Sequence, residues 1–178
     1  MQDVKRQELS DIKIKIKEYL KYFIIIVFIF FFDRISKIYL LNLYDSGTDV
    51  DFYILPYLNI YLVFNTGVGF GLFASESNFI YHFLTFIVGI INLVLILLLF
   101  KQNSMNKYFI SIILGGSLGN FFDRIYYSFV PDFLDFHIEN FHWFIFNIAD
   151  VFITIGIICL IIVEIFTKDT NVNNEKNI

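Results

Sequence analysis

Ionisable side chains are rare in the apolar parts of this sequence, and their positions mark where chemistry is possible. A charged group inside a membrane-spanning segment is costly to bury, so each one is a candidate functional residue. Seven lie within or at the ends of long apolar segments: Asp33, Arg34, Lys37, Asp123, Arg124, Asp150 and Glu164. We interpret Glu164 as interfacial because it lies near the inner end of its segment, whereas the others cluster toward the predicted outer side.

Two of the carboxylates are accompanied by an amide at helical spacing. Asn120 and Asp123 are three residues apart, as are Asn147 and Asp150, and residues at this spacing share one face of a helix. Both pairs are expected at a similar depth. A further acid, Asp132, is expected on a loop that returns to the membrane surface above Asp150.

Two carboxyl groups that meet in a partly desolvated place share one proton, because ionising both is unfavourable. The ionised group can then take a proton from water while the protonated group donates to a carbonyl oxygen, which is the chemistry of aspartic peptide hydrolysis. This reaction needs no metal and no cofactor, and we expect neither. From the residues alone, Asp150 is the stronger candidate and Asp132 the weaker one.

The remaining charges near the outer side are predicted to be structural. Asp123–Arg124 and Asp33–Lys37 are interpreted as ion pairs. The cations among them, together with Arg34, lie on the side of the membrane where Lys and Arg are usually depleted. We therefore expect each of these cations to have a specific partner.

Other reactive residue types give weaker signals. The histidines His82, His137 and His142 show no metal-ligand grouping in the sequence, and we interpret them as packing or interfacial residues. Cys159 is predicted to be a small apolar packing residue, because it lies deep in an apolar segment with no base nearby. We therefore predict no metal site.

The composition defines the class of protein that must position these groups. The chain has 178 residues, of which 57% are hydrophobic and 17% are charged. Soluble domains contain about 25% charged residues, so a soluble globular protein is excluded, and the many aromatic and β-branched residues exclude a disordered chain. A helix needs about 20 apolar residues to cross a bilayer. Four ranges qualify and predict a polytopic membrane protein: about 19–41, 79–100, 108–127 and 143–167.

The positions of Lys and Arg predict the orientation, because cytoplasmic loops are enriched in both. Cations precede the first apolar range, lie between the second and third, and follow the fourth, whereas none lies in 42–78 or 125–149. Both termini and the 101–107 loop are therefore predicted to be cytoplasmic. We divide the chain into a basic cytoplasmic segment (1–18), one membrane domain (19–167) and a polar cytoplasmic tail (168–178).

The outer connection 42–78 contains a predicted sheet. Over 52–65 apolar residues alternate with mixed ones, and a period of two is typical of a strand with two different faces. Pro56 indicates an edge position or a break into two strands. Gly115 and Gly119 predict close approach of a neighbouring helix. The predicted fold is a membrane all-α core of four transmembrane helices, with a small extracytoplasmic β-sheet between the first two.

Four segments together resemble lipoprotein signal peptidase, also called signal peptidase II, a family of bacterial membrane enzymes that cleave prolipoproteins. Their order, their spacing and the four-span layout carry the resemblance, which covers residues 31–156. The segments are Asp33-Arg34-Ile35-Ser36-Lys37; Asn65-Thr66-Gly67-Val68-Gly69-Phe70-Gly71; Gly115-Gly116-Ser117-Leu118-Gly119-Asn120-Phe121-Phe122-Asp123-Arg124 with Val130-Pro131-Asp132-Phe133; and Phe146-Asn147-Ile148-Ala149-Asp150.

The resemblance implies roles for the polar residues of these segments. It implies that Asp132 and Asp150 are the catalytic pair, which raises Asp132 above its rank from the residues alone. The residues implied to bind substrate are Asn65, Asn120, Arg124 and Asn147. Those implied to have supporting roles are Asp33, Lys37, Asp123, Gly67 and Gly71.

The resemblance also implies a substrate: diacylglyceryl-modified prolipoproteins, cut just before the lipidated Cys at the outer side of the bacterial inner membrane. The implied partners are these precursors and membrane lipids, with no nucleic acid, and we expect a monomer. The alternative is a non-enzymatic polytopic membrane protein with an ion- or proton-linked Asp pair, which predicts flux and gives Asp132 no essential role. An assembly factor that binds partner peptides at a strand edge predicts binding without cleavage.

Overall fold

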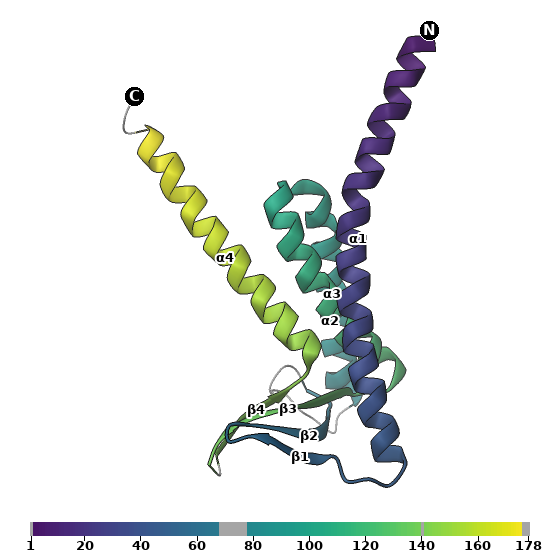
Figure 1. Ribbon diagram of the computed structural model, residues 1–178, viewed down its shortest axis with the longest axis vertical. Helices are drawn as coiled ribbons and strands as arrows, with labels where there is room; N and C mark the ends of the chain where they lie inside the picture. Colours follow the sequence, from purple (N-terminus) through teal and green to yellow (C-terminus); the bar gives the residue numbers. More distant parts are fainter. Residues whose placement is uncertain (1, 68–77, 140, 176–178) are drawn as a thin grey trace.

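The computed structural model describes residues 2–67, 78–139 and 141–175. Four helices and a four-stranded antiparallel sheet make up this part of the chain, and Figure 1 shows the sheet at one end of the helices. The helices are α1 (Gln2–Asp45), α2 (Asn78–Lys101), α3 (Ser104–Tyr126) and α4 (Ile148–Glu175). The strands are β1 (Asp51–Leu55), β2 (Leu58–Asn65), β3 (Val130–Ile138) and β4 (Phe141–Phe146).

Helix α3 is the central helix, because it packs against α1, α2 and α4. Small residues allow these contacts. A Cβ atom on Gly115 would lie 2.9 Å from Cβ of Ile29 in α1, and one on Gly119 would lie 2.7 Å from Oδ2 of Asp33. The close approach predicted for Gly115 and Gly119 is therefore confirmed, and the neighbouring helix is α1.

Helices α2 and α4 are each long and apolar enough to cross a membrane, over Phe79–Lys101 and Ile148–Phe166. Many of their large apolar side chains are exposed. Helix α1 differs because Asp33, Arg34 and Lys37 interrupt its apolar sequence, and all three are buried. These three charges of α1 therefore face the protein interior.

The sheet has the order β1-β2-β3-β4. The break predicted at Pro56 is confirmed, because Pro56 lies in the turn between β1 and β2 and β1 is an edge strand. The prediction of a sheet only between the first two helices is wrong. Strands β3 and β4, between α3 and α4, complete the sheet, so Asp132 lies on a strand and not on a loop.

One consequence of the packing is testable at Gly116. A Cβ atom there would lie 2.6 Å from the backbone oxygen of Ala149, which cannot rotate away. We expect Gly116→Ala to lower the free energy of unfolding by about 1–3 kcal/mol, the usual cost of overpacking, measured by reversible unfolding in mixed micelles. Gly89→Ala is the control, because its Cβ would contact only the Phe121 ring at 3.3 Å. Equal stability of the two variants would contradict the tight α3–α4 contact.

Candidate active site

Asp132 lies on β3, where two amide groups hold its carboxylate. Asn65 Nδ2, at the end of β2, donates to Asp132 Oδ2 at 2.7 Å, and Asn147 Nδ2 donates to Oδ1 at 2.5 Å. The pairing of β2 with β3 brings Asn65 here, since Val63 is directly opposite Asp132. Asp132 is only 2% exposed. Burial, and to a lesser extent the nearby Asp150, raise the pKa of its carboxyl from an ordinary 3.8 to about 7.

Asp150 lies in the first turn of α4 and is held by amides as well. Asn147 directly precedes the helix: its Oδ1 accepts from the Asp150 backbone N–H at 3.1 Å, and its own N–H donates to Asp150 Oδ2 at 3.2 Å. This reciprocal pattern is that of a helix capping box. Asn120 Nδ2 donates to the other oxygen of Asp150 at 2.8 Å. The Asn147 side chain therefore contacts both aspartates and joins them into one cluster.

Lys37 forms a second layer behind this cluster. Its ammonium group donates to Asp33 Oδ2 at 2.7 Å, to Asp123 Oδ2 at 2.7 Å and to Asn120 Oδ1 at 2.8 Å. Lys37 is fully buried, as are both of these carboxylates. The amide of Asn120 thus connects Lys37 to Asp150, and its orientation is fixed at both ends.

The same layer fixes the start of α4. Asp33 Oδ1 accepts from the backbone N–H of Ala149 at 2.9 Å. A carboxylate near a helix N-terminus satisfies a free donor and interacts favourably with the helix dipole. The ion pair predicted between Asp33 and Lys37 is confirmed, and its further role is to position the helix that carries Asp150.

The Arg124 side chain extends to the end of β2 and does not pair with Asp123, its neighbour in sequence. Its guanidinium donates to the backbone oxygen of Gly67, and Gly67 N–H donates to Asn65 Oδ1 at 2.7 Å. The predicted Asp123–Arg124 ion pair is wrong, because Asp123 pairs with Lys37 and Arg34. The two side chains diverge because neighbouring positions on a helix are about 100° apart. The expectation of a specific partner is confirmed for all three outer cations.

Most of the residues named from the sequence meet in this cluster, with one outside the described ranges and one contributor, Tyr81, that was missed. Gly71 lies in 68–77 and is not described. Arg34 was expected to have a partner but was not assigned to Asp123. Tyr81, whose hydroxyl donates to the Arg124 backbone oxygen at 2.7 Å, was not named from the sequence.

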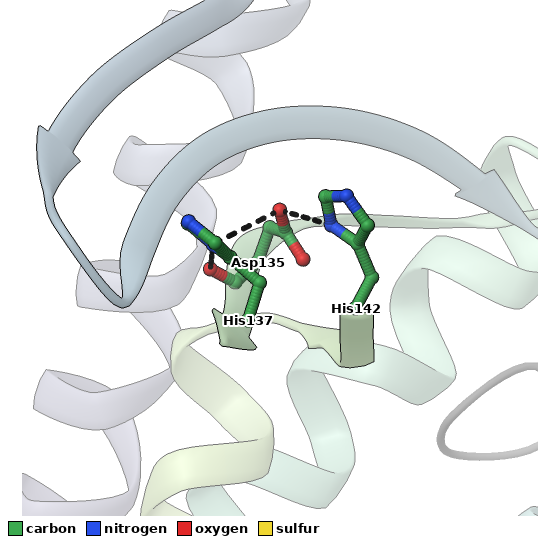
Figure 2. A group of neighbouring side chains, drawn as sticks. All are labelled: Asp135, His137 and His142. Carbon is green, nitrogen blue, oxygen red and sulfur yellow. Dashed lines mark hydrogen bonds and ion pairs between the residues drawn. The ribbon is translucent and has the colours of Figure 1, made fainter. Parts of the chain in front are cut away.

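The interpretation of the histidines as ungrouped is wrong for two of them. His137 on β3 and His142 on β4 are cross-strand partners, and Figure 2 shows both rings beside the carboxylate of Asp135. One ligand atom from each of these three residues lies within 4.8 Å of the others. The period of two from Asp135 to His137, with His142 five residues later, was the signal in the sequence that could have revealed the group.

The geometry of Asp132 and Asp150 suits proton transfer. Each carboxyl group is oriented by two or more hydrogen bonds from groups that are themselves fixed. A carboxyl group with a pKa of about 7 exists in both protonation states near neutral pH, which is the condition for efficient general acid or base catalysis. The two acids come from different elements, β3 and α4, so the fold and not local sequence brings them together.

Comparison with known proteins identifies the family. The family model described as Signal peptidase (SPase) II matches residues 25–166. A protein named lipoprotein signal peptidase from Pelagibacter ubique (strain HTCC1062) is 46% identical over 165 residues, covering 93% of this chain and 99% of its own. A protein of the same name from Francisella tularensis subsp. novicida (strain U112) is 40% identical over 154 residues, covering 84% and 94%.

Solved structures agree with this result. Two structures described as bacterial membrane enzymes each superpose with a TM-score of 0.63, at 30% and 33% identity. The first match covers 84% of this chain and 89% of that chain, and the second covers 80% and 91%. The matched region contains the helices and the sheet that hold the aspartate cluster. This chain is an integral membrane protein that belongs to the signal peptidase II family, and it is therefore a protease.

Proposed function

We propose that the chain is an aspartic endopeptidase that removes the signal peptide from diacylglyceryl-modified prolipoproteins by cutting just before the lipidated Cys. The observation that carries the proposal is the junction made by Asn147, whose side chain contacts both Asp132 and Asp150. Membership of the signal peptidase II family and relatives named lipoprotein signal peptidase support the choice of substrate.

In the proposed mechanism the two carboxyl groups hold one proton between them. The ionised group removes a proton from water as the water oxygen bonds to the scissile carbonyl carbon, and the protonated group donates to the carbonyl oxygen. The carbon–nitrogen bond then breaks as the carboxyl that took the proton from water gives it to the nitrogen of the lipidated Cys, and the other carboxylate takes back its proton from the hydroxyl as the carbonyl re-forms. Asn65 and Asn147 keep the Asp132 carboxyl in place, and Asn120 does the same for Asp150.

Arg124 is proposed to help bind the peptide backbone of the substrate. It lies beside the end of β2 through its contact with Gly67, and the Tyr81 hydroxyl holds its backbone oxygen. Asn65, Asn120 and Asn147 complete the proposed substrate-binding set, as amides that present donors and acceptors next to the acids. Asp33, Lys37, Asp123 and Gly67 support this set through the hydrogen bonds given above.

The proposed topology has four spans, cytoplasmic termini and an extracytoplasmic sheet. Figure 1 shows the N-terminal end of α1, the far end of α4 and the short α2–α3 connection on the side away from the sheet. The cations that precede the first span lie in this part of α1. Under the positive-inside rule this arrangement supports a site at the outer leaflet of the bacterial inner membrane. We propose that the protein acts as a monomer. The acyl chains of its substrate then stay in lipid while the scissile peptide bond reaches the aspartates.

The proposal is tested by the mass of a synthetic diacylglyceryl precursor peptide before and after incubation with the purified protein. We expect two products, divided on the N-terminal side of the lipidated Cys. The same peptide without the lipid is the control and should remain uncut. Cleavage at another bond, or no cleavage of the lipidated peptide, would contradict the proposal.

The pKa of Asp132 gives a prediction for the pH dependence of cleavage. Below a pH of about 7 this carboxyl is mostly protonated and the pair keeps its shared proton; above it the proton is lost. We therefore expect kcat/KM to fall about tenfold per pH unit on the alkaline side of this value. Asn65→Ala removes a donor that favours the ionised form, so its alkaline limb should move to higher pH. An alkaline limb that stays in place in this variant would contradict the assignment to Asp132.

A further inference from the structure

A second cluster of polar groups lies on the sheet, on the face opposite Asp132. Alternate residues of a strand point to opposite faces, so Asp135 and His137 share one face of β3 while Asp132 points to the other. His142 on β4 is the direct cross-strand partner of His137. Figure 2 shows the Asp135 carboxylate between the two imidazole rings. The hairpin turn thus gathers two imidazoles and one carboxylate.

The distances in this cluster are close to those of a metal site. His142 Nδ1 lies 2.8 Å and His137 Nδ1 lies 3.5 Å from the same oxygen of Asp135, Oδ2. Ligand atoms around a tetrahedral zinc ion, each about 2.0–2.2 Å from the metal, lie about 3.4 Å from one another. The His142 side chain is 57% exposed, so its ring can rotate without repacking the core. Small side-chain rotations would therefore give a coordinating geometry.

An unsatisfied carboxylate oxygen is the independent observation that points to a ligand. Asp135 is 1% exposed, and its Oδ1 is buried with no hydrogen-bond partner in the described part of the chain. An unpartnered oxygen of a buried carboxylate is costly, and a bound cation would remove this cost. Asn59, opposite Asp135 on β2, also has a buried and unpartnered side-chain oxygen.

The cluster opens into a cavity that is rich in acceptors. The cavity has a volume of about 400 Å³. Its lining residues are Asp51, Asn59, Tyr61, Asp135, His142 and Ile145. Among the described residues, two carboxylates and no Lys or Arg line it, which favours a positively charged ligand over an anion. The cavity also leaves room for water at an open coordination position.

We propose that Asp135, His137 and His142 bind one divalent transition-metal cation, with Zn²⁺ as the expected ion. Two imidazoles and one carboxylate, with the fourth position open to water, form a common ligand set for zinc. Imidazole ligands favour Zn²⁺, Cu²⁺ or Ni²⁺ over Ca²⁺ and Mg²⁺, which prefer oxygen ligands alone. The ion would join β3 to β4 across the hairpin, on the opposite face of the strand that carries Asp132. This position separates the ion from the proposed peptidase chemistry.

The binding test uses full-length protein without a polyhistidine tag, stripped with a chelator in detergent and then dialysed against Zn²⁺. We expect about one zinc ion per chain in the wild type, and background levels in His137→Ala and His142→Ala. His82→Ala is the matched control, because His82 is exposed on α2, outside the cluster, and this variant should keep the ion. Background zinc in the wild type, or zinc that persists in a variant with both His137→Ala and His142→Ala, would overturn the proposal.

A spectroscopic measurement separates coordination from hydrogen bonding between Asp135 and the histidines. Co²⁺ added to the stripped wild-type protein should give the intense visible bands of a tetrahedral ion, and Zn²⁺ should abolish them by displacement. His142→Ala should lack the bands while its unfolding temperature without metal stays near that of the wild type, since the His142 ring is mostly exposed. A spectrum like that of free Co²⁺ in the wild type would show that the cluster is held by hydrogen bonds alone.

Discussion

Replacing Asp132 or Asp150 with Asn is expected to lower the rate of precursor cleavage by about 10²–10⁴-fold, the usual contribution of a positioned acid or base. Asn has nearly the shape of Asp, but it can neither take a proton from water nor give one to a carbonyl oxygen. Both variants should remain folded, because each Asn keeps the side-chain shape and one acceptor oxygen, although its NH2 group replaces an oxygen that accepted a hydrogen bond. The measurement is the single-turnover rate on a lipidated precursor peptide, followed by mass, with the unfolding temperature recorded for each variant.

Asp45→Asn is the matched control for these variants. Asp45 is exposed at the sheet end of α1, so the substitution removes a carboxylate at a similar position along the molecule without touching the cluster. We expect its rate to be close to that of the wild type. If Asp132→Asn or Asp150→Asn cleaved at a near-normal rate, the assignment of the catalytic pair would be wrong.

Lys37→Met is expected to lower the free energy of unfolding by about 3–5 kcal/mol, the cost of leaving buried charges without their partner. Lys37 is fully buried and contacts the carboxylates of Asp33 and Asp123 at 2.7 Å each. Met fills a similar volume but cannot neutralise either group. Cleavage should fall as well, because the Asn120 amide that orients Asp150 loses its second contact. Reversible unfolding in mixed micelles measures the loss.

Glu18→Gln provides the comparison for Lys37→Met. Glu18 pairs with Lys107 at 3.1 Å near the other end of the helices, and its side chain is 35% exposed. Partly exposed pairs contribute about 1 kcal/mol or less, so this variant should be nearly as stable as the wild type. An equal loss of unfolding free energy in the two variants would show that the ion pairs of Lys37 stabilise the fold no more than the partly exposed Glu18–Lys107 pair does.

The local patterns in the sequence predicted much of the helical part of the fold. Helix positions and the close approach of Gly115 and Gly119 depend on residues a few positions apart, so spacing alone indicates them. The alternation over 52–65 and the break at Pro56 likewise predicted β1 and β2. These features are local, and the structure confirms them, except that residues 143–146 of the fourth predicted span belong to β4 and the helix begins at Ile148.

The structure departs from the prediction where pairing is non-local. Strand β3 was interpreted as a loop because Pro131 and two aspartates obscure its alternation, and its partner β2 is distant in sequence. The hydrogen bond from Asn65 to Asp132 joins residues 67 positions apart. For the same reason Asp132 ranked low from the residues alone, and only its likeness to a family motif raised it.

The same limit explains the ion pairs and the histidines. Opposite charges at adjacent positions, as at Asp123 and Arg124, suggest an ion pair, but adjacent side chains on a helix point in different directions. The partners of Asp123 are on α1. His137 and His142 are only five positions apart, but they become neighbours through a hairpin that the sequence did not predict. Contacts between elements required the fold, whereas contacts within a helix did not.

The central claim is that Asp132 and Asp150 act as one catalytic unit, and a double-mutant cycle tests it most directly. Single-turnover cleavage of the lipidated precursor is measured for the wild type, Asp132→Asn, Asp150→Asn and the double variant. Residues that act as a unit give strongly non-additive losses, so the double variant should cleave no more slowly than the slower single variant. Losses that multiply in the double variant would show that the two acids contribute independently, and this result would contradict the shared-proton mechanism.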